Sequence, residues 1–228
     1  MSLGKIIAIE GIDASGKGTQ ANKVIEYINS TGRNAILYNF PRYNTPVGKQ
    51  IARYLTGEFG GINQVPYELI CIAFGADRAA VSSEINDHVN NGDFVILDRY
   101  TYSNVFTAAK LPKEKWMDFI DWVENMEFEN LGVIPPDCNF YLYIDPKLAM
   151  KRILNRGKRK YQSNKNDIHE TDRMLLKNTS DCYTQIANNK NNWFLINQMN
   201  KEGNQLSEDE VFKLIKGKLD ILLNEWNI

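Results

Sequence analysis

One stretch near the N-terminus constrains the fold of this chain more than any other. An apolar run at residues 6–9 ends at Glu10, and the sequence GIDASGKGT follows at residues 11–19. A strand, a glycine-rich loop with a lysine and then an amphipathic helix form the context that a phosphate-binding P-loop requires. Glycines let the backbone turn its N–H groups inward, and the N-terminus of the following helix adds partial positive charge. The residues that we expect to bind nucleotide phosphates are Gly11, Ala14, Ser15, Gly16, Lys17, Gly18 and Thr19.

The rest of the chain continues this alternation of strand and helix. Further apolar runs of strand length lie at residues 35–38, 94–97, 140–144 and 193–196. Several are continuous, which is typical of strands buried on both faces of a parallel sheet. Segments with helical spacing lie at about 19–30, 67–90, 113–130, 146–155, 168–189 and 207–227. The pattern predicts an α/β P-loop fold with a doubly wound, five-stranded parallel sheet between two helical layers, in a single domain over residues 1–228.

The composition argues against several classes of function. Lysine plus arginine number 27 and aspartate plus glutamate 28, so the chain lacks the basic excess of a protein that binds nucleic acid in bulk. Two histidines argue against a histidine metal site or a Ser–His triad. Three widely spaced cysteines indicate free thiols in a reducing compartment. With no recognisable signal peptide and no long apolar run, we expect a cytoplasmic protein that does not bind a membrane.

A carboxylate and an arginine follow the third apolar run directly, in the sequence Asp98-Arg99-Tyr100. The carboxyl ends of parallel strands form the edge of the sheet where ligands bind in such folds. Beside a P-loop, Asp98 is expected to help hold Mg²⁺, directly or through water. Arg99 is expected to face an anionic substrate with its planar guanidinium group. An ordinary Asp–Arg surface pair is the alternative interpretation.

Two more arginines occupy positions that call for an anionic partner. Arg42 comes just after the second apolar run, and Arg78 interrupts an otherwise apolar helical segment. A charge in such a segment is costly to bury unless it is paired. A substrate phosphate is one candidate partner for Arg78, and Asp77 or Glu84 is the structural alternative.

The segment at residues 155–167 differs from the rest in composition. It carries five basic residues and almost no apolar ones. Composition alone indicates a solvated loop. Its position, after the fourth strand and the helix that follows it, leaves a role near the phosphate site open.

Taken in order, these motifs resemble the thymidylate kinase family of nucleoside monophosphate kinases over about residues 5–225. The resemblance rests on an ordered set: Glu10-Gly11-Ile12-Asp13 opening the P-loop, Phe40-Pro41-Arg42, Phe74 with Arg78, and Asp98-Arg99-Tyr100 followed by Ser103-Asn104. Phe40-Pro41-Arg42 and Asp98-Arg99-Tyr100, in this order, are its most specific part. The P-loop alone is shared by many enzymes. The resemblance implies ATP·Mg²⁺ as phosphate donor, dTMP as acceptor and dTDP as product, in a protein that is usually a homodimer.

The resemblance also implies roles for individual residues. Phe74 would stack on the base, Arg78 would hold it, and Ser103 and Asn104 would contact it. Residues 155–167 would form a lid over ATP, whose closure excludes water. The other residues that the resemblance assigns to the acceptor nucleotide are Asp13, Phe40, Pro41, Arg42, Arg99 and Tyr100.

Three departures from the family pattern bear on these roles. Some members carry a P-loop arginine where this chain has Ala14, so we expect the lid to supply that charge through Arg156 or Arg159. The usual metal-binding hydroxyl after Lys17 is replaced by Gly18, as in adenylate kinases. The third departure is Ala108, where relatives often carry a polar group, and it leaves the base preference open. The residues that we expect to act in catalysis are Asp13, Lys17, Arg99, Arg156 and Arg159.

Other functions remain as alternatives. A kinase for dUMP or a modified pyrimidine monophosphate would use the same machinery. A deoxynucleoside kinase commonly needs a carboxylate base after the second strand, where this chain has Phe40-Pro41-Arg42. The sequence at residues 164–167 fits the N-K-x-D pattern of guanine-binding switches, but it follows a polar loop and not a buried strand, so we interpret the match as coincidence.

Overall fold

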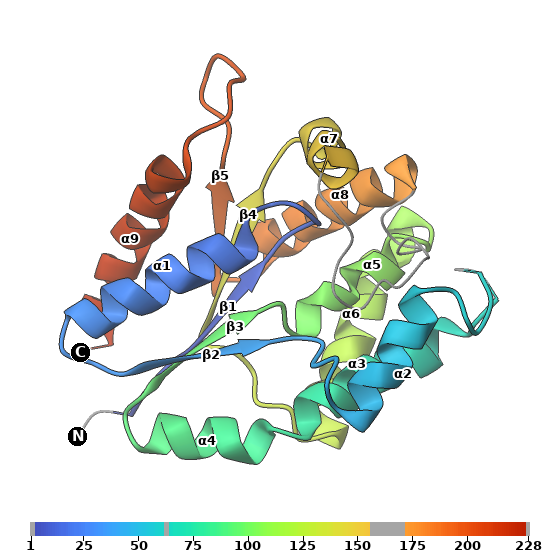
Figure 1. Cartoon of the computed structure of the whole chain (residues 1–228), viewed down its shortest axis with the longest axis horizontal. Coiled ribbons are helices and arrows are strands. Elements are labelled where there is room, and N and C mark those ends of the chain that lie inside the picture. The colour runs from blue at the N-terminus through green and yellow to red at the C-terminus, as the bar shows by residue number, and fades with distance from the viewer. Residues whose placement is uncertain (1–2, 62–63, 156–171, 227–228) are drawn as a thin grey trace.

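The computed structural model of the chain describes residues 3–61, 64–155 and 172–226. Within these residues, five parallel strands form one sheet in the order β2-β3-β1-β4-β5 (Figure 1). The strands are β1 (Ile6–Glu10), β2 (Ala35–Asn39), β3 (Phe94–Asp98), β4 (Cys138–Tyr143) and β5 (Trp193–Asn197). Each of the five predicted strands is present, and the predicted fold class is confirmed.

Burial along the strands explains why their sequences read as continuous apolar runs. Every residue of the central strand β1 is buried, and so is every residue of β3 except its last. The outermost strands β2 and β5 are only partly buried, because each has a neighbour on one side only. The register pairs Ile9 of β1 with Asp98 of β3, so the P-loop and Asp98 emerge at the same edge of the sheet.

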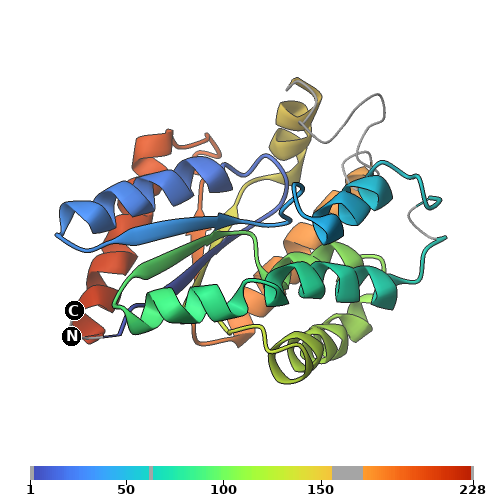
Figure 2. The same cartoon turned by 60° about the horizontal axis from the view of Figure 1, so that its bottom comes forward.

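Helices cover both faces of the sheet (Figures 1 and 2). On one face, α1 and α9 pack against Ile7 and Ile9 of β1. On the other, α4 packs against Ile6 and Ala8, because side chains of a strand alternate between its two faces. The helices are α1 (Lys17–Ser30), α2 (Pro46–Leu55), α3 (Tyr67–Ala79), α4 (Ser82–Asn90), α5 (Val105–Ala108), α6 (Trp116–Glu124), α7 (Pro146–Asn155), α8 (Arg173–Asn189) and α9 (Glu208–Glu225).

The helical segments differ from the prediction in three places. The single helix expected at residues 67–90 is wrong, because α3 ends at Ala79 and α4 starts at Ser82. Val81 lies between them and packs against the sheet. The chain changes direction there although the sequence has no glycine or proline at this point. The segment expected at 113–130 is helical but not uniform, since α6 is followed by a π-helical turn, Asn125–Asn130. Helix α2 was not predicted, although Thr45 caps it and Pro46 begins it.

The three cysteines are free thiols, as predicted, and all three are buried. Burial raises the pKa of Cys71 and that of Cys182 to about 12. Within the described ranges, the chain contains no helix with the length and apolar character needed to cross a membrane.

Candidate active site

A glycine-dependent turn joins β1 to α1 and forms the predicted phosphate cradle. Gly11 has a φ of 151°, and a Cβ atom there would come within 2.8 Å of the Ser15 hydroxyl and 2.9 Å of the Leu142 carbonyl. Gly16 has a left-handed φ of 84° and precedes the first residue of α1. A larger residue at either position would strain the turn, so both glycines are required by its geometry.

Lys17 is the first residue of α1 and is buried. Its ammonium group donates to the Ile12 carbonyl at 2.8 Å and lies 3.4 Å from the Ser15 hydroxyl. The lysine side chain therefore folds back over the loop. The ammonium and the N-terminus of α1 bring positive charge to the same small volume, which suits a polyphosphate.

Asp98 lies beside this cradle, as its position at the end of β3 predicted. A Cβ atom added to Gly18 would lie 3.2 Å from an oxygen of the Asp98 carboxylate. Gly18, which replaces the usual hydroxyl residue, therefore has no side chain that would crowd the Asp98 carboxylate. No group of three or more carboxylate, imidazole or thiol side chains gathers anywhere in the described part of the chain. The donors at this place suit Mg²⁺, which commonly binds through one or two carboxylates, substrate phosphates and water.

Arg99 and Asp13 connect the cradle to a neighbouring cavity. One guanidinium nitrogen of Arg99 lies 2.6 Å from the Asp13 carboxylate, and the guanidinium carbon lies 5.4 Å from the centre of the Phe106 ring. Arg99 has a φ of 69°, a left-handed conformation that costs a non-glycine residue about 1–2 kcal/mol. A strained backbone of this kind is characteristic of functional positions.

The cavity lies between α2, α3, α5 and the segment that follows β2. It contains eight of the ten residues predicted to bind the acceptor nucleotide. All of its lining residues are Asp13, Phe40, Pro41, Tyr43, Leu55, Phe74, Arg78, Arg99, Ser103, Asn104, Phe106 and Thr107. The mixture of aromatic rings with a few charged and amide groups is typical of a site for a small polar ligand with a flat ring.

Two residues predicted to bind the acceptor do not line this cavity. Arg42 is paired with Asp77, whose carboxylate accepts from the Arg42 backbone N–H at 2.8 Å and from its guanidinium at 3.1 Å. Tyr100 is fully buried behind Phe40 and donates its hydroxyl to the Ile134 carbonyl at 3.0 Å. In this structure both side chains make contacts that support the cavity wall.

Arg78 pairs with neither Asp77 nor Glu84, so the structural alternative for its partner is wrong. Asp77 binds Arg42, and Glu84 accepts from the Tyr38 hydroxyl. Arg78 instead forms a two-pronged ion pair with Glu127, which lies in the π-helical turn 49 residues further along the chain. Sequence reasoning missed Glu127, because no local pattern marks a partner so distant.

The structure shows the surroundings of Ala108 and Ala14, two positions that depart from the family pattern. Ala108 is fully buried in the core, and the polar side chain that lines the cavity in this region is its neighbour, Thr107. Arg152 of α7 donates to the carbonyl of Ala14 at 2.8 Å. A guanidinium group therefore contacts the P-loop at Ala14, the residue that departs from the family pattern described above. Arg156, Arg159 and all but the first residue of the predicted lid lie outside the described residues.

Glu10 is a second buried carboxylate that sequence reasoning did not single out as functional. It accepts hydrogen bonds from the Tyr183 hydroxyl at 2.7 Å, the Ser103 hydroxyl at 2.8 Å and the Tyr100 backbone N–H at 2.8 Å. Burial raises its pKa above the ordinary value, although these hydrogen bonds act in the opposite direction. Glu10 thereby ties the end of β1 to Ser103 in the cavity wall.

Comparison with known proteins finds relatives that are named thymidylate kinase. The family model described as "Thymidylate kinase" matches residues 9–210. The thymidylate kinase of Mycobacterium tuberculosis is 34% identical over 184 residues, which are 80% of this chain and 85% of that protein. The Arabidopsis thaliana thymidylate kinase is 30% identical over 222 residues, covering 94% of this chain and 75% of that one. The solved structure of the Candida albicans thymidylate kinase is 26% identical and superimposes with a TM-score of 0.72, covering 98% of this chain and 94% of the other.

Proposed function

The chain belongs to the thymidylate kinase family, and we propose that it transfers the γ-phosphoryl group of ATP to dTMP, forming ADP and dTDP. One observation carries the proposal for this chain. The phosphate cradle at residues 11–19 and the aromatic cavity share a boundary at Asp13 and Arg99. A donor and an acceptor that occupy these two sites bring their phosphates together at that boundary.

We propose that the donor triphosphate binds the loop and Lys17, with Asp98 helping to hold Mg²⁺. A bound Mg²⁺ would neutralise charge on the phosphate oxygens. The protein needs no general base, because a monophosphate oxygen is already anionic near neutral pH. The chain therefore contributes alignment and positive charge, which dominate the catalysis of phosphoryl transfer.

We propose that Arg99 binds the acceptor phosphate and that Arg152 binds the moving phosphoryl group. Arg99 lies at the boundary between cradle and cavity, held by Asp13. Arg152 already contacts the P-loop at Ala14. Arg156 and Arg159 remain predicted lid residues with the same kind of charge.

The cavity also presents the hydrogen-bonding pattern of a thymine or uracil ring. Arg78 uses two of its three guanidinium nitrogens on Glu127, and the amide nitrogen of Asn104 donates to the Thr101 carbonyl at 2.9 Å and to Glu127 at 2.8 Å. The third nitrogen of Arg78 and the amide oxygen of Asn104 are left for the cavity that both residues line. A donor beside an acceptor complements O4 and N3–H of thymine, whereas cytosine has the reverse pattern. Phe74 would stack on the ring.

We further propose that the protein is a homodimer. Helix α3 exposes Leu69 and Ile72, whose side chains are 59% and 42% accessible. Tyr67 and Trp122 are also exposed and both rings contact Phe119 of α6, so apolar side chains are accessible on α3 and α6. A second copy of the chain is the proposed partner of this surface. The buried free thiols support a reducing compartment, and we propose the cytoplasm.

Steady-state assays with ATP, Mg²⁺ and a panel of nucleoside monophosphates test the proposed function. Formation of dTDP from dTMP, with weaker turnover of dUMP and none of purine monophosphates, is the expected result. Preference for another monophosphate would move the substrate assignment while leaving the phosphoryl-transfer mechanism. No transfer to any monophosphate, together with tight GTP binding, would contradict it.

A further inference from the structure

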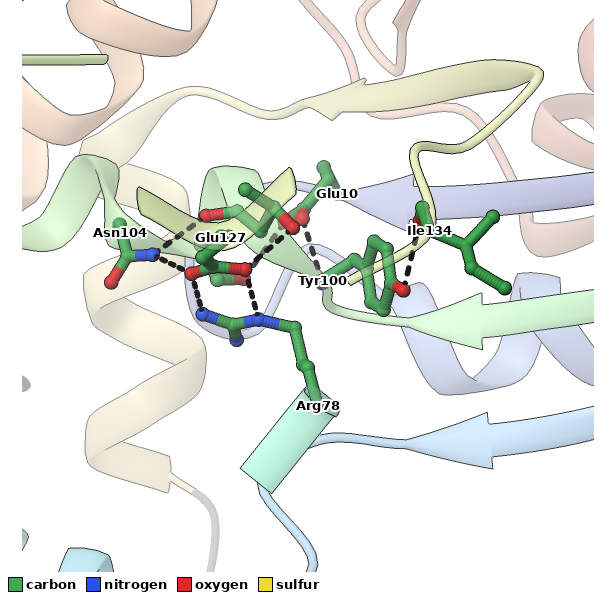
Figure 3. A network of polar contacts seen from close by, with 8 residues as sticks. Glu10, Arg78, Tyr100, Asn104, Glu127 and Ile134 are labelled. Atoms are coloured by element: carbon green, nitrogen blue, oxygen red, sulfur yellow. Dashed lines mark hydrogen bonds and ion pairs between the residues drawn. The ribbon is translucent and has the colours of Figure 1, made fainter. Parts of the chain in front are cut away.

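Glu127 lies at the centre of a buried polar cluster behind the cavity (Figure 3). Its side chain is 0% accessible, and it does not line the cavity itself. One carboxylate oxygen accepts from Nε of Arg78 at 2.7 Å and from the Thr101 hydroxyl at 2.7 Å. The other accepts from Nη2 of Arg78 and, at 2.8 Å, from the amide of Asn104. Four donors from three residues therefore meet at one carboxylate, two from Arg78 of α3 and two from the 3-10 helix Thr101–Asn104.

These contacts determine which atoms of Arg78 and Asn104 remain for a ligand. In Figure 3, the third guanidinium nitrogen of Arg78 and the amide oxygen of Asn104 both point away from Glu127. Neither atom makes a hydrogen bond to any residue that the structure describes. Glu127 therefore leaves one donor, the third nitrogen of Arg78, and one acceptor, the amide oxygen of Asn104, to face a bound base.

The orientation of the Asn104 amide follows from the same contacts. Its nitrogen faces two oxygens, the Thr101 carbonyl and the Glu127 carboxylate. A reversed amide would place its oxygen against these two acceptors, and both would repel it. Among hydrogen-bonding side chains, an ionised carboxylate is the one that can accept from both Arg78 and Asn104 without offering a donor of its own.

Resting on the proposed function, we propose that Glu127 is a positioning residue that makes the pocket select 4-keto over 4-amino pyrimidine monophosphates. It acts through Arg78 and Asn104, and it does not touch the nucleotide. Its place in a π-helical turn agrees with this role, since such turns occur frequently at functional sites. A buried ion pair kept for stability alone is weakly motivated, because apolar replacements of such pairs are often equally stable.

The test is the ratio of kcat/KM for dTMP to kcat/KM for dCMP in the Glu127→Gln variant. Glutamine keeps the shape but offers one oxygen and one NH₂ group. This NH₂ group cannot accept from the donors that Glu127 binds, so the Asn104 amide loses one of the two contacts that fix it. Its nitrogen can then turn toward the cavity, against N3–H of thymine. We expect the ratio to fall at least about tenfold, because a site built to bind a polar group discriminates strongly by it. The change is expected in KM for dTMP, with KM for ATP within about twofold of the wild type, since Glu127 lies away from the cradle.

Glu124→Gln is the matched control. This carboxylate lies one turn earlier, accepts from the Tyr102 hydroxyl at 2.6 Å and binds Lys190 at 2.7 Å, outside the cluster. The control should leave the ratio unchanged. If Glu127→Gln does not fold, as judged by circular dichroism, Glu127→Asp serves instead. It keeps a charge opposite Arg78 but cannot reach all four donors, and the same fall in ratio is expected.

The outcomes separate the two proposals. A wild-type enzyme that does not phosphorylate dTMP contradicts the proposed function. A wild type that prefers dTMP, with a folded Glu127 variant that loses thermal stability but keeps the ratio, overturns only the positioning role. Glu127 would then be structural.

Discussion

Replacing Arg152 with methionine removes a positive charge from the P-loop while preserving most of the side chain's apolar length. In the structure its guanidinium donates to the Ala14 carbonyl at 2.8 Å. A hydrogen bond from a charged group contributes about 1.5–3 kcal/mol. If this group moves to the transferred phosphoryl in the transition state, its loss raises the barrier by that amount. The expected fall in kcat is therefore about 10- to 150-fold, at about 1.4 kcal/mol per factor of ten.

The assay measures ADP release at saturating ATP and dTMP, with a single-turnover experiment to separate chemistry from product release. KM for dTMP should hardly change, because Arg152 does not line the acceptor cavity. Lys151→Met is the matched control, since Lys151 is the exposed neighbour on the same helix and carries the same charge. Its kcat should stay within about twofold of the wild type, as is usual for an exposed charge.

A kcat for Arg152→Met within twofold of the wild type would refute the proposed role of Arg152 in binding the transferred phosphoryl group. The charge on the moving phosphoryl would then have to come from Arg156 or Arg159. A large fall in both Arg152→Met and Lys151→Met would also refute it, because the effect would then reflect the overall charge of α7 and not the contact with Ala14.

Four further predictions follow from single contacts. Phe74→Ala should raise KM for dTMP about 5- to 100-fold in steady-state assays, the value of one stacked base, and an unchanged KM would remove Phe74 from the base site. Gly18→Ala should raise the Mg²⁺ concentration for half-maximal rate about tenfold, because its Cβ would lie 3.2 Å from the Asp98 carboxylate; equal Mg²⁺ dependence would count against Asp98 as a ligand. Burial raises the pKa of Glu10 above its ordinary value of 4.5, so its contribution to stability is complete below that pH and is lost as pH rises through the folded-state pKa. Urea unfolding should show the wild type losing stability relative to Glu10→Gln above about pH 4.5, by at most about 1.4 kcal/mol per pH unit, and a difference independent of pH would contradict this. Leu69→Glu should convert the protein to monomers in analytical ultracentrifugation. If the variant stays as dimeric as the wild type, the interface lies elsewhere.

The fold could be predicted from sequence because its strongest signals are local. Strands buried on both faces appear as uninterrupted apolar runs, and the loop of Gly11 and Lys17 fixes which strand lies beside the ligand. The break between α3 and α4 could not be predicted in this way. It arises where Val81 turns toward the sheet, which is a tertiary contact without a local breaker residue.

The candidate site divides along the same line. Asp98 and Arg99 follow a strand, so topology alone places them near the P-loop. The pairing of Arg78 with Glu127 joins segments 49 residues apart, and it requires knowing how α3 meets the π-helical turn. Arg152 has the sequence context of a solvated basic helix, and only the packing of α7 brings it to Ala14. The contacts that could not be predicted from the sequence are therefore those between elements far apart in the chain.

Transfer of phosphate from ATP to dTMP is tested most directly by a single-turnover experiment with ATP labelled in its γ-phosphate, Mg²⁺, dTMP and enzyme in excess over ATP. We predict that the label leaves ATP and appears in the β-phosphate of dTDP, with little released as inorganic phosphate. Label that remains on ATP, or that appears only as inorganic phosphate while dTMP is unchanged, would contradict the assignment of this chain as a dTMP kinase.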